Sequence, residues 1–108
     1  MIRRGHIYRV RMPGEGKERP ALVLSPDRRN ELSETVVVVP CTTVKRFGPW
    51  HVQLRRGEGG LAEASVVKCE DVTTIARQRL VPRPLGGPLS AERLNEIRAG
   101  LMRALDFE

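Results

Sequence analysis

The chain has 108 residues, which suits a single domain spanning 1–108, and its composition is that of an ordinary globular protein rather than a disordered or fibrous one. Nineteen Lys and Arg against thirteen Asp and Glu leave a net charge of +6, which favours an anionic partner such as nucleic acid. The N-terminus lacks the apolar stretch of a signal peptide and no segment has the roughly 20 apolar residues of a membrane span, so we expect a cytoplasmic protein without a membrane partner.

The first half of the chain predicts three strands separated by turns. Residues 7–12 alternate between apolar and basic side chains, and residues 13–20 form a polar loop rich in turn formers. An apolar run at 21–24 is followed by four valines at 36–39, a pattern that suits a strand buried on both faces. Because Pro40 has no N–H to donate to a sheet ladder, we expect this strand to end at Val39 or at the proline itself.

The second half predicts further short strands and then a helix. Strands are expected at 50–54, where His and Gln face away from Trp, Val and Leu, and at the segments 65–69, 72–75 and 80–81. After residue 88 the apolar period becomes helical, with Leu94, Ile97, Leu101 and Leu105 on one face.

The predicted helix has a recognisable start and one weak point. Ser90 is a suitable N-cap, and Leu89 can pack against Leu94 as a hydrophobic staple. Gly100 costs about 1 kcal/mol relative to alanine, and its lack of a side chain allows close packing at that position. Many short strands with one terminal helix predict a mainly β fold, a small barrel of antiparallel strands with a C-terminal helix.

Polar side chains follow the valine run at once and form a first candidate site. Thr42 and Thr43 stand just beyond a rigid strand, where a hydroxyl is held in place and can donate to a phosphate oxygen. Lys45 and Arg46 come next and lead to Trp50, and cations beside an aromatic ring suit single-stranded nucleic acid. The same pattern also allows two β-favouring threonines at a strand end and a solvated pair of cations.

Arg19 is the second candidate for a functional residue. It stands where the polar loop enters a buried strand, so the backbone that carries its side chain is held in place. A salt bridge to Glu15 or Glu18 is the simpler alternative. His51 lies on the polar side of its strand. It fits three roles: a general base, an RNA contact or a surface histidine without a function. Glu70 either faces a groove or belongs to a strand connection.

Other kinds of site find little support in the sequence. The chain has two cysteines without a CxxC motif and only two histidines, so a zinc site is not expected. Cys41 and Cys69 are set among strand-forming residues and fit small buried hydrophobes. No Ser-His-Asp triad and no pair of carboxylates of the glycosidase type can be placed.

Taken together, six stretches in register resemble the MazF/PemK family of toxins from type II toxin–antitoxin systems. They are RRGHIYRV at the start, ERPALVLSP at 18–26, VVVVPCTTVK at 36–45, PWHVQL at 49–54, GGLAEASVVKCEDV at 59–72 and LSAERLNEIRAGLMRAL at 89–105. The resemblance implies an SH3-like β-barrel with a C-terminal helix that works as a homodimer. It also implies an endoribonuclease that needs no metal or cofactor, cuts single-stranded RNA, often mRNA, and is neutralised by a cognate antitoxin.

The resemblance also implies roles for individual residues. Arg19 matches the arginine of the family's RPA motif and Thr42 the first threonine after the strand, so both are expected to be catalytic. The family's RNA contacts map more loosely, onto Lys17 and Glu18 in the loop and onto His51 and Glu70. Thr43, Lys45 and Arg46 are added to the expected RNA contacts from the pattern described above.

The expected reaction is attack by the RNA's own 2′-hydroxyl, leaving a 2′,3′-cyclic phosphate and a 5′-hydroxyl end. The loop before Arg19 is shorter than in many relatives, which predicts a change in the accepted RNA sequence. Two alternatives remain open. One is a toxin of the same fold that poisons DNA gyrase, as the CcdB branch does, and the other is a barrel that binds nucleic acid without cutting it.

Overall fold

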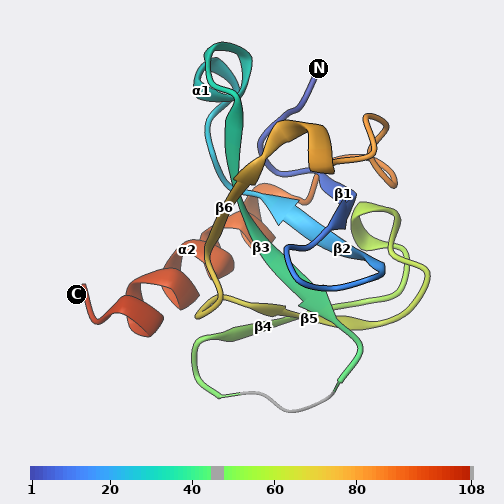
Figure 1. Cartoon of the computed structure of the whole chain (residues 1–108). Coiled ribbons are helices and arrows are strands. Elements are labelled where there is room, and N and C mark those ends of the chain that lie inside the picture. Colours follow the sequence, from blue (N-terminus) through green and yellow to red (C-terminus); the bar gives the residue numbers. More distant parts are fainter. Residues whose placement is uncertain (45–47, 108) are drawn as a thin grey trace.

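The computed structural model describes residues 1–44 and 48–107. In this part of the chain six antiparallel strands form a sheet with the order β1-β2-β3-β5-β4, and β6 also pairs with β3 (Figure 1). The prediction of a mainly β fold with a C-terminal helix is confirmed. The elements are β1 (Ile7–Arg11), β2 (Glu18–Val23), α1 (Asp27–Leu32), β3 (Thr35–Thr42), β4 (His51–Leu54), the 3-10 turn η1 (Glu58–Gly60), β5 (Ser65–Lys68), β6 (Thr73–Ala76), the 3-10 turn η2 (Arg77–Arg79) and α2 (Ala91–Leu105).

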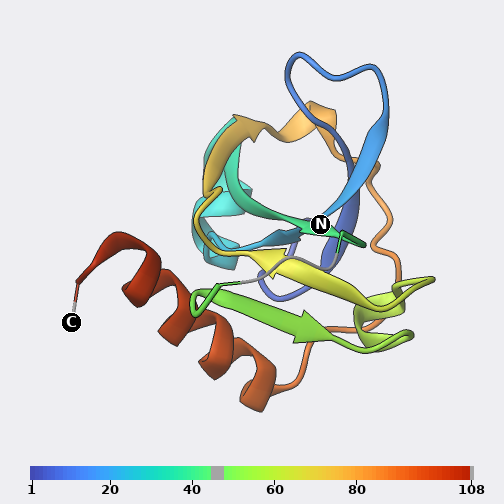
Figure 2. The ribbon, with the colours of Figure 1, turned by 90° about the horizontal axis from the view of Figure 1, so that it is seen from below.

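β3 is the strand on which the sheet is built. One of its edges pairs with β2, and the other pairs first with β6 and then, from Cys41, with β5. Beyond β6 the chain returns to β1, where Val10 forms a bridge with Leu80. The strand expected at 80–81 is reduced to this single bridge, which closes β1, β2, β3 and β6 into a barrel (Figures 1 and 2).

β2 and β3 are buried on both faces, as the valine run predicts for β3. Val36 and Val38 point into the barrel, whose apolar filling we call the barrel core; its other members are Ile2, Tyr8, Val10, Met12, Ala21, Val23, Ile75 and Leu80. Val39 points the other way, into a helix core between the sheet and α2 that also contains Ile7, Leu22, Cys41, Val52, Leu54, Leu61, Val67, Cys69, Leu89 and Ile97.

α2 starts as the sequence predicts and lies beneath β4 and β5 (Figure 2). The Ser90 hydroxyl accepts the Arg93 N–H at 3.1 Å, and Leu89 and Ile97 are buried in the helix core. Leu105, the last member of the predicted apolar face, is 53% exposed. The end of the helix extends past the sheet, so its last turn has no strand to pack on (Figure 2). No helix in the described residues is long and apolar enough to cross a membrane.

Two strand boundaries differ from the prediction by more than one residue. β2 begins at Glu18, inside the expected loop, because β1 pairs with it as far as Arg11 opposite that residue. β3 continues through Pro40 to Thr42. The proline nitrogen faces the edge where pairing with β6 has ended at Val38 and pairing with β5 has not yet begun, so its missing N–H interrupts no ladder there.

The six-residue helix α1 is not predicted from the sequence. Its segment has no helical apolar period, and a helix this short is not stable by itself. Buried polar contacts hold it instead. Asn30 is fully buried and donates from Nδ2 to the Ser25 carbonyl at 2.9 Å, and the Ser25 hydroxyl accepts the Val37 N–H of β3 at 3.0 Å.

Gly100 in α2 allows the helix to approach the sheet closely. A Cβ at this position would lie 2.6 Å from the Trp50 carbonyl oxygen and 2.9 Å from Cys69 Sγ. Overpacking costs about 1–3 kcal/mol, which outweighs the ~1 kcal/mol that alanine gains in helix propensity. We expect Gly100→Ala to lower the free energy of unfolding measured in urea. Gly87→Ala, where nothing lies within 4 Å, is the control, and equal stability of the two variants would contradict the prediction.

An ion pair ties η1 to α2 and makes stability depend on pH. Arg93 Nε donates to Glu58 Oε1 at 2.9 Å, and this hydrogen bond lowers the pKa of Glu58 below its ordinary value of 4.5. A lowered pKa in the folded state means that the stabilisation is present above the unfolded value and is lost as the pH falls through the folded one. We expect the free energy of unfolding, measured in urea at a series of pH values, to fall less steeply towards acid pH in Glu58→Gln than in the wild-type protein. The control Glu31→Gln, a change at an exposed position of α1, should retain the wild-type dependence on pH.

Candidate functional site

The sheet face that lines the barrel core continues beyond the core into an open cavity of about 440 Å³. On β3, Val38 belongs to the core and Thr42 lines the cavity; on β2, Ala21 belongs to the core and Arg19 lines the cavity. Because alternate residues of a strand share a face, the strands that fill the barrel also direct these two side chains into one space. The cavity is lined by Met12, Glu15, Arg19, Pro40, Cys41, Thr42, Lys68, Glu70, Asp71, Val72 and Thr73.

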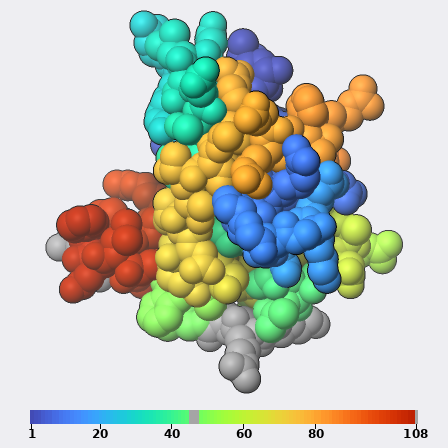
Figure 3. All heavy atoms as spheres, in the orientation of Figure 1, coloured from blue at the N-terminus to red at the C-terminus, as the bar shows by residue number. Residues whose placement is uncertain are grey.

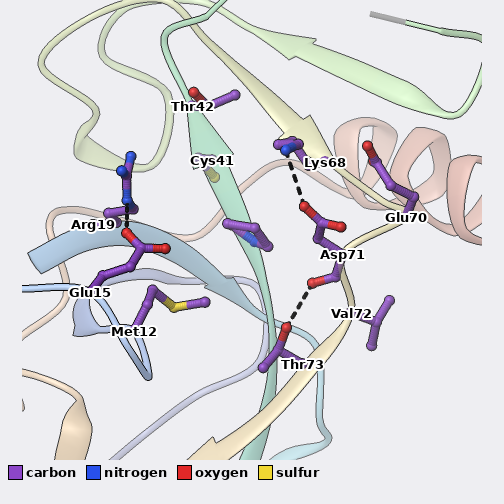
Figure 4. Close-up of a pocket in the computed structure, with 11 residues that line it drawn as sticks. Met12, Glu15, Arg19, Cys41, Thr42, Lys68, Glu70, Asp71, Val72 and Thr73 are labelled. Atoms are coloured by element: carbon purple, nitrogen blue, oxygen red, sulfur yellow. Dashed lines mark hydrogen bonds and ion pairs between the residues drawn. The ribbon is translucent and has the colours of Figure 1, made fainter.

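The strand register brings Arg19 and Thr42 to the same level. Ala21 lies opposite Pro40 in the β2–β3 ladder, so two residues further along Arg19 comes opposite Thr42. Figure 4 shows Thr42 on β3 between Arg19 on one side and Lys68 on the other. In the space-filling view the β1–β2 segment, the end of β3 and the β5–β6 connection come together on this face (Figure 3).

A proline opens the sheet at this point. Leu24 donates its N–H to Val37 on β3, so the backbone nitrogens of alternate β2 residues, including that of Pro20, face β3. Pro20 has no N–H to continue the ladder, and regular pairing stops at Ala21. The ends of β2 and β3 are therefore free to separate, and the cavity lies between them.

The Thr42 hydroxyl is oriented to donate. Its oxygen accepts the Val44 N–H at 3.2 Å, a contact that fixes the side chain at the end of β3. Among the described residues no acceptor takes its proton, so the O–H is available to a ligand oxygen.

The Arg19 guanidinium pairs with Glu15, one of the two partners that the sequence suggests. Both side chains are more than one-third exposed, and an ion pair of this kind is weak. The guanidinium is thus held at the edge of the cavity by a carboxylate that an anionic ligand can replace.

His51 is more deeply placed than its polar neighbours suggest, with a side chain only 9% exposed. Its Nδ1 accepts the Gly48 N–H at 3.0 Å, and its Nε2 lies 2.8 Å from Glu70 Oε1. Because Nδ1 is an acceptor, the neutral ring carries its proton on Nε2 and donates it to Glu70. Burial alone would raise the pKa of Glu70, but the hydrogen bond from His51 and weaker contacts outweigh it and lower that pKa.

The two cysteines are buried thiols. Burial raises the pKa of Cys41 to about 12, with a further contribution from nearby Cys69, and it raises the pKa of Cys69 to about 11. A thiol that stays protonated at neutral pH is a poor nucleophile. Among the described residues no group of three or more His, Cys, Asp or Glu side chains is arranged to hold a metal ion.

The expected site residues divide into those that line the cavity and those that do not. Arg19, Thr42 and Glu70 line it. Lys17, Glu18 and Thr43 are exposed nearby on the chain but are not among the lining residues, and neither is His51, which reaches the site through Glu70. Lys45 and Arg46 lie outside the described residues.

Sequence reasoning missed Lys68 and Asp71, which line the cavity from the β5–β6 side. Lys68 lies between Val67 and Cys69 of the helix core, and because neighbouring residues of a strand point to opposite faces, it points away from that core. The strand's place beside β3 is needed to bring it to the cavity, and no local pattern contains that information.

The fold places the chain among small antiparallel β-barrels with a C-terminal helix. It is similar to the Mycobacterium tuberculosis toxin MazF-mt6, with 27% identity and a TM-score of 0.84 over 95% of this chain and 98% of that one. A sequence model of the PemK-like, MazF-like toxins of type II toxin–antitoxin systems matches residues 3–105. The chain belongs to this family.

Two further solved structures contain an antitoxin. One is an endoribonuclease in complex with its cognate antitoxin from a mycobacterial species, with 26% identity and a TM-score of 0.85 over 100% of this chain and 98% of that one. The other is MazE-MazF from Deinococcus radiodurans, with 25% identity and a TM-score of 0.82 over 99% of this chain and 97% of that one.

The His51–Glu70 contact gives a testable structural prediction. His51→Ala removes a side chain that joins Gly48 to the β5–β6 connection, and we expect a loss of about 1–3 kcal/mol in the free energy of unfolding. The pKa of Glu70, followed by NMR, should rise because the hydrogen bond that lowers it is gone. Gln53→Ala, an exposed change on the same strand, should move neither quantity. An unchanged Glu70 pKa in His51→Ala would show that the contact does not persist in solution.

Proposed function

We propose that the protein is an endoribonuclease toxin that cleaves single-stranded RNA by attack of the 2′-hydroxyl on the adjacent phosphate. The observation that carries the proposal is that Arg19 and Thr42, distant in sequence, line one cavity from neighbouring strands. The nucleophile belongs to the RNA, so the protein needs neither an activated side chain nor a metal ion. This chemistry fits a cavity whose lining residues include no histidine. The buried thiol of Cys41 stays protonated and is no nucleophile either.

Arg19 and Thr42 have complementary roles in this reaction. The phosphorane carries more negative charge than the ground state, and a guanidinium meets two phosphate oxygens with a fixed fork of donors. Thr42 donates its free O–H to the same phosphate. Groups that are already in place where charge develops stabilise the transition state with little reorganisation.

In the proposed reaction Glu15 accepts the proton of the attacking 2′-hydroxyl. It lines the cavity, and its carboxylate is released when the phosphate takes its place on Arg19. The P–O5′ bond then breaks and the leaving oxygen takes a proton from solvent. The products are a 2′,3′-cyclic phosphate and a 5′-hydroxyl end.

The substrate and partners follow from the same site. Bases must be unstacked to be read at their edges, which favours single-stranded RNA such as mRNA in the cytoplasm. By analogy with the complexes of its relatives, the chain is neutralised by a cognate antitoxin, and a net charge of +6 favours an acidic antitoxin segment. As the family resemblance implies, the active form is a homodimer.

The decisive experiment is incubation of the purified protein with total RNA in EDTA, followed by sequencing of the 5′-hydroxyl ends. We expect cuts at one short sequence, and no cleavage of the same sequence made as DNA. Arg19→Ala and Thr42→Ala should each lower the rate by roughly 10²–10³, the usual effect of removing one such donor. Arg28→Ala, which changes the same charge on α1, should leave the rate unchanged.

Two results would count against the proposal. Cleavage at the normal rate by folded Arg19→Ala and Thr42→Ala would remove these residues from the reaction. RNA that stays intact with the wild-type protein would instead favour a barrel that binds without cutting, or a toxin that acts on gyrase.

A further inference from the structure

Lys68 is a second cation in the cavity, outside the residues expected to be functional. It ends β5, and the β3–β5 ladder pairs Cys41 with Val67, so Lys68 comes opposite Pro40 on the face that carries Thr42. Side chains that are diagonal across an antiparallel ladder start about 7–8 Å apart. Lys68 and Thr42 therefore face adjoining parts of any RNA strand that lies in the cavity.

A short turn holds a carboxylate beside this lysine. Lys68 Nζ lies 3.1 Å from Asp71 Oδ2. The Asp71 backbone is fixed at both ends, because its N–H donates to the Lys68 carbonyl at 2.9 Å and its carbonyl accepts the Thr73 hydroxyl at 3.0 Å (Figure 4). The carboxylate is thus positioned by the β5–β6 connection and not by the ion pair alone.

The cavity therefore contains two cation–carboxylate pairs on opposite sides of Thr42, Arg19–Glu15 and Lys68–Asp71 (Figure 4). The Lys68 and Asp71 side chains are 37% and 48% exposed, and exposed ion pairs are weak. A phosphate accepts charge-assisted hydrogen bonds as well as a carboxylate does, so it can replace Asp71 beside the ammonium. Arg19 and Lys68 thus each have a carboxylate as counter-ion within the cavity.

We propose that Lys68 binds an RNA phosphate next to the one that is cleaved, and that Asp71 is its counter-ion until RNA displaces it. The inference rests on the proposed function and makes Lys68 a binding residue, not a catalytic one. A contact made equally in the ground state and the transition state affects KM and leaves kcat unchanged. Loss of Lys68 should therefore weaken RNA binding without slowing the chemical step.

Binding is measured by fluorescence anisotropy with random-sequence single-stranded RNA over a range of salt concentrations. A Thr42→Ala background slows cleavage during the measurement. Lys68→Ala should weaken binding and make the slope of log K against log salt shallower by about 0.7, the value for one phosphate contact on a single strand. Lys68→Arg should retain the slope. Asp71→Asn should bind more tightly, because it leaves the lysine without its counter-ion.

Steady-state cleavage by the otherwise wild-type protein gives the second readout, in which Lys68→Ala should raise KM and keep kcat. Arg28→Ala makes the same change of charge away from the cavity. A Lys68→Ala variant that behaves like Arg28→Ala would overturn the proposal, as would weaker binding by Asp71→Asn. Failure of the proposed nuclease has a different signature: the wild-type protein would produce no 5′-hydroxyl ends, and the binding series would still decide the role of Lys68.

Discussion

The two-sided burial of β2 and β3 is the constraint on which the rest of the structure depends. Each strand supplies one face to the helix core and the other to the barrel core, and the second face runs on into the cavity. The packing that stabilises the barrel therefore also sets the direction of Arg19 and Thr42. A shift of either strand by one residue would turn its whole set of side chains to the other face, so the direction of these two side chains cannot change without a change in the core.

Two prolines make an open site compatible with this rigid sheet. Pro40 lies in β3 where one edge changes partner from β6 to β5, and Pro20 ends the regular β2–β3 ladder. In each case the missing N–H falls where the ladder is interrupted. The polar groups of the cavity thus stand on strands that are firmly packed at one end and separated at the other. Such sites are more precise than sites on loops, because the backbone is already ordered before a ligand arrives.

Under the proposed function, the charges of the cavity allow one site to bind two kinds of anionic partner. Arg19 and Lys68 are paired with Glu15 and Asp71, so any anionic ligand must exchange with these carboxylates. RNA and an acidic antitoxin segment would meet the same requirement, and they would compete for it. His51 takes no part in this exchange of counter-ions. Its two nitrogens join Gly48 to Glu70 at the margin of the cavity.

The sequence by itself determined the fold class, the family, the helix start at Ser90 and the choice of Arg19 and Thr42 as candidate site residues. These depend on the local spacing of apolar residues and on motifs that are continuous in the chain. Only the tertiary structure decided the ends of β2 and β3, the helix α1, the burial of His51 and the presence of Lys68 and Asp71 in the cavity. These features depend on which strands are neighbours and in what register. That information lies in contacts between residues far apart in sequence, where no local pattern records it.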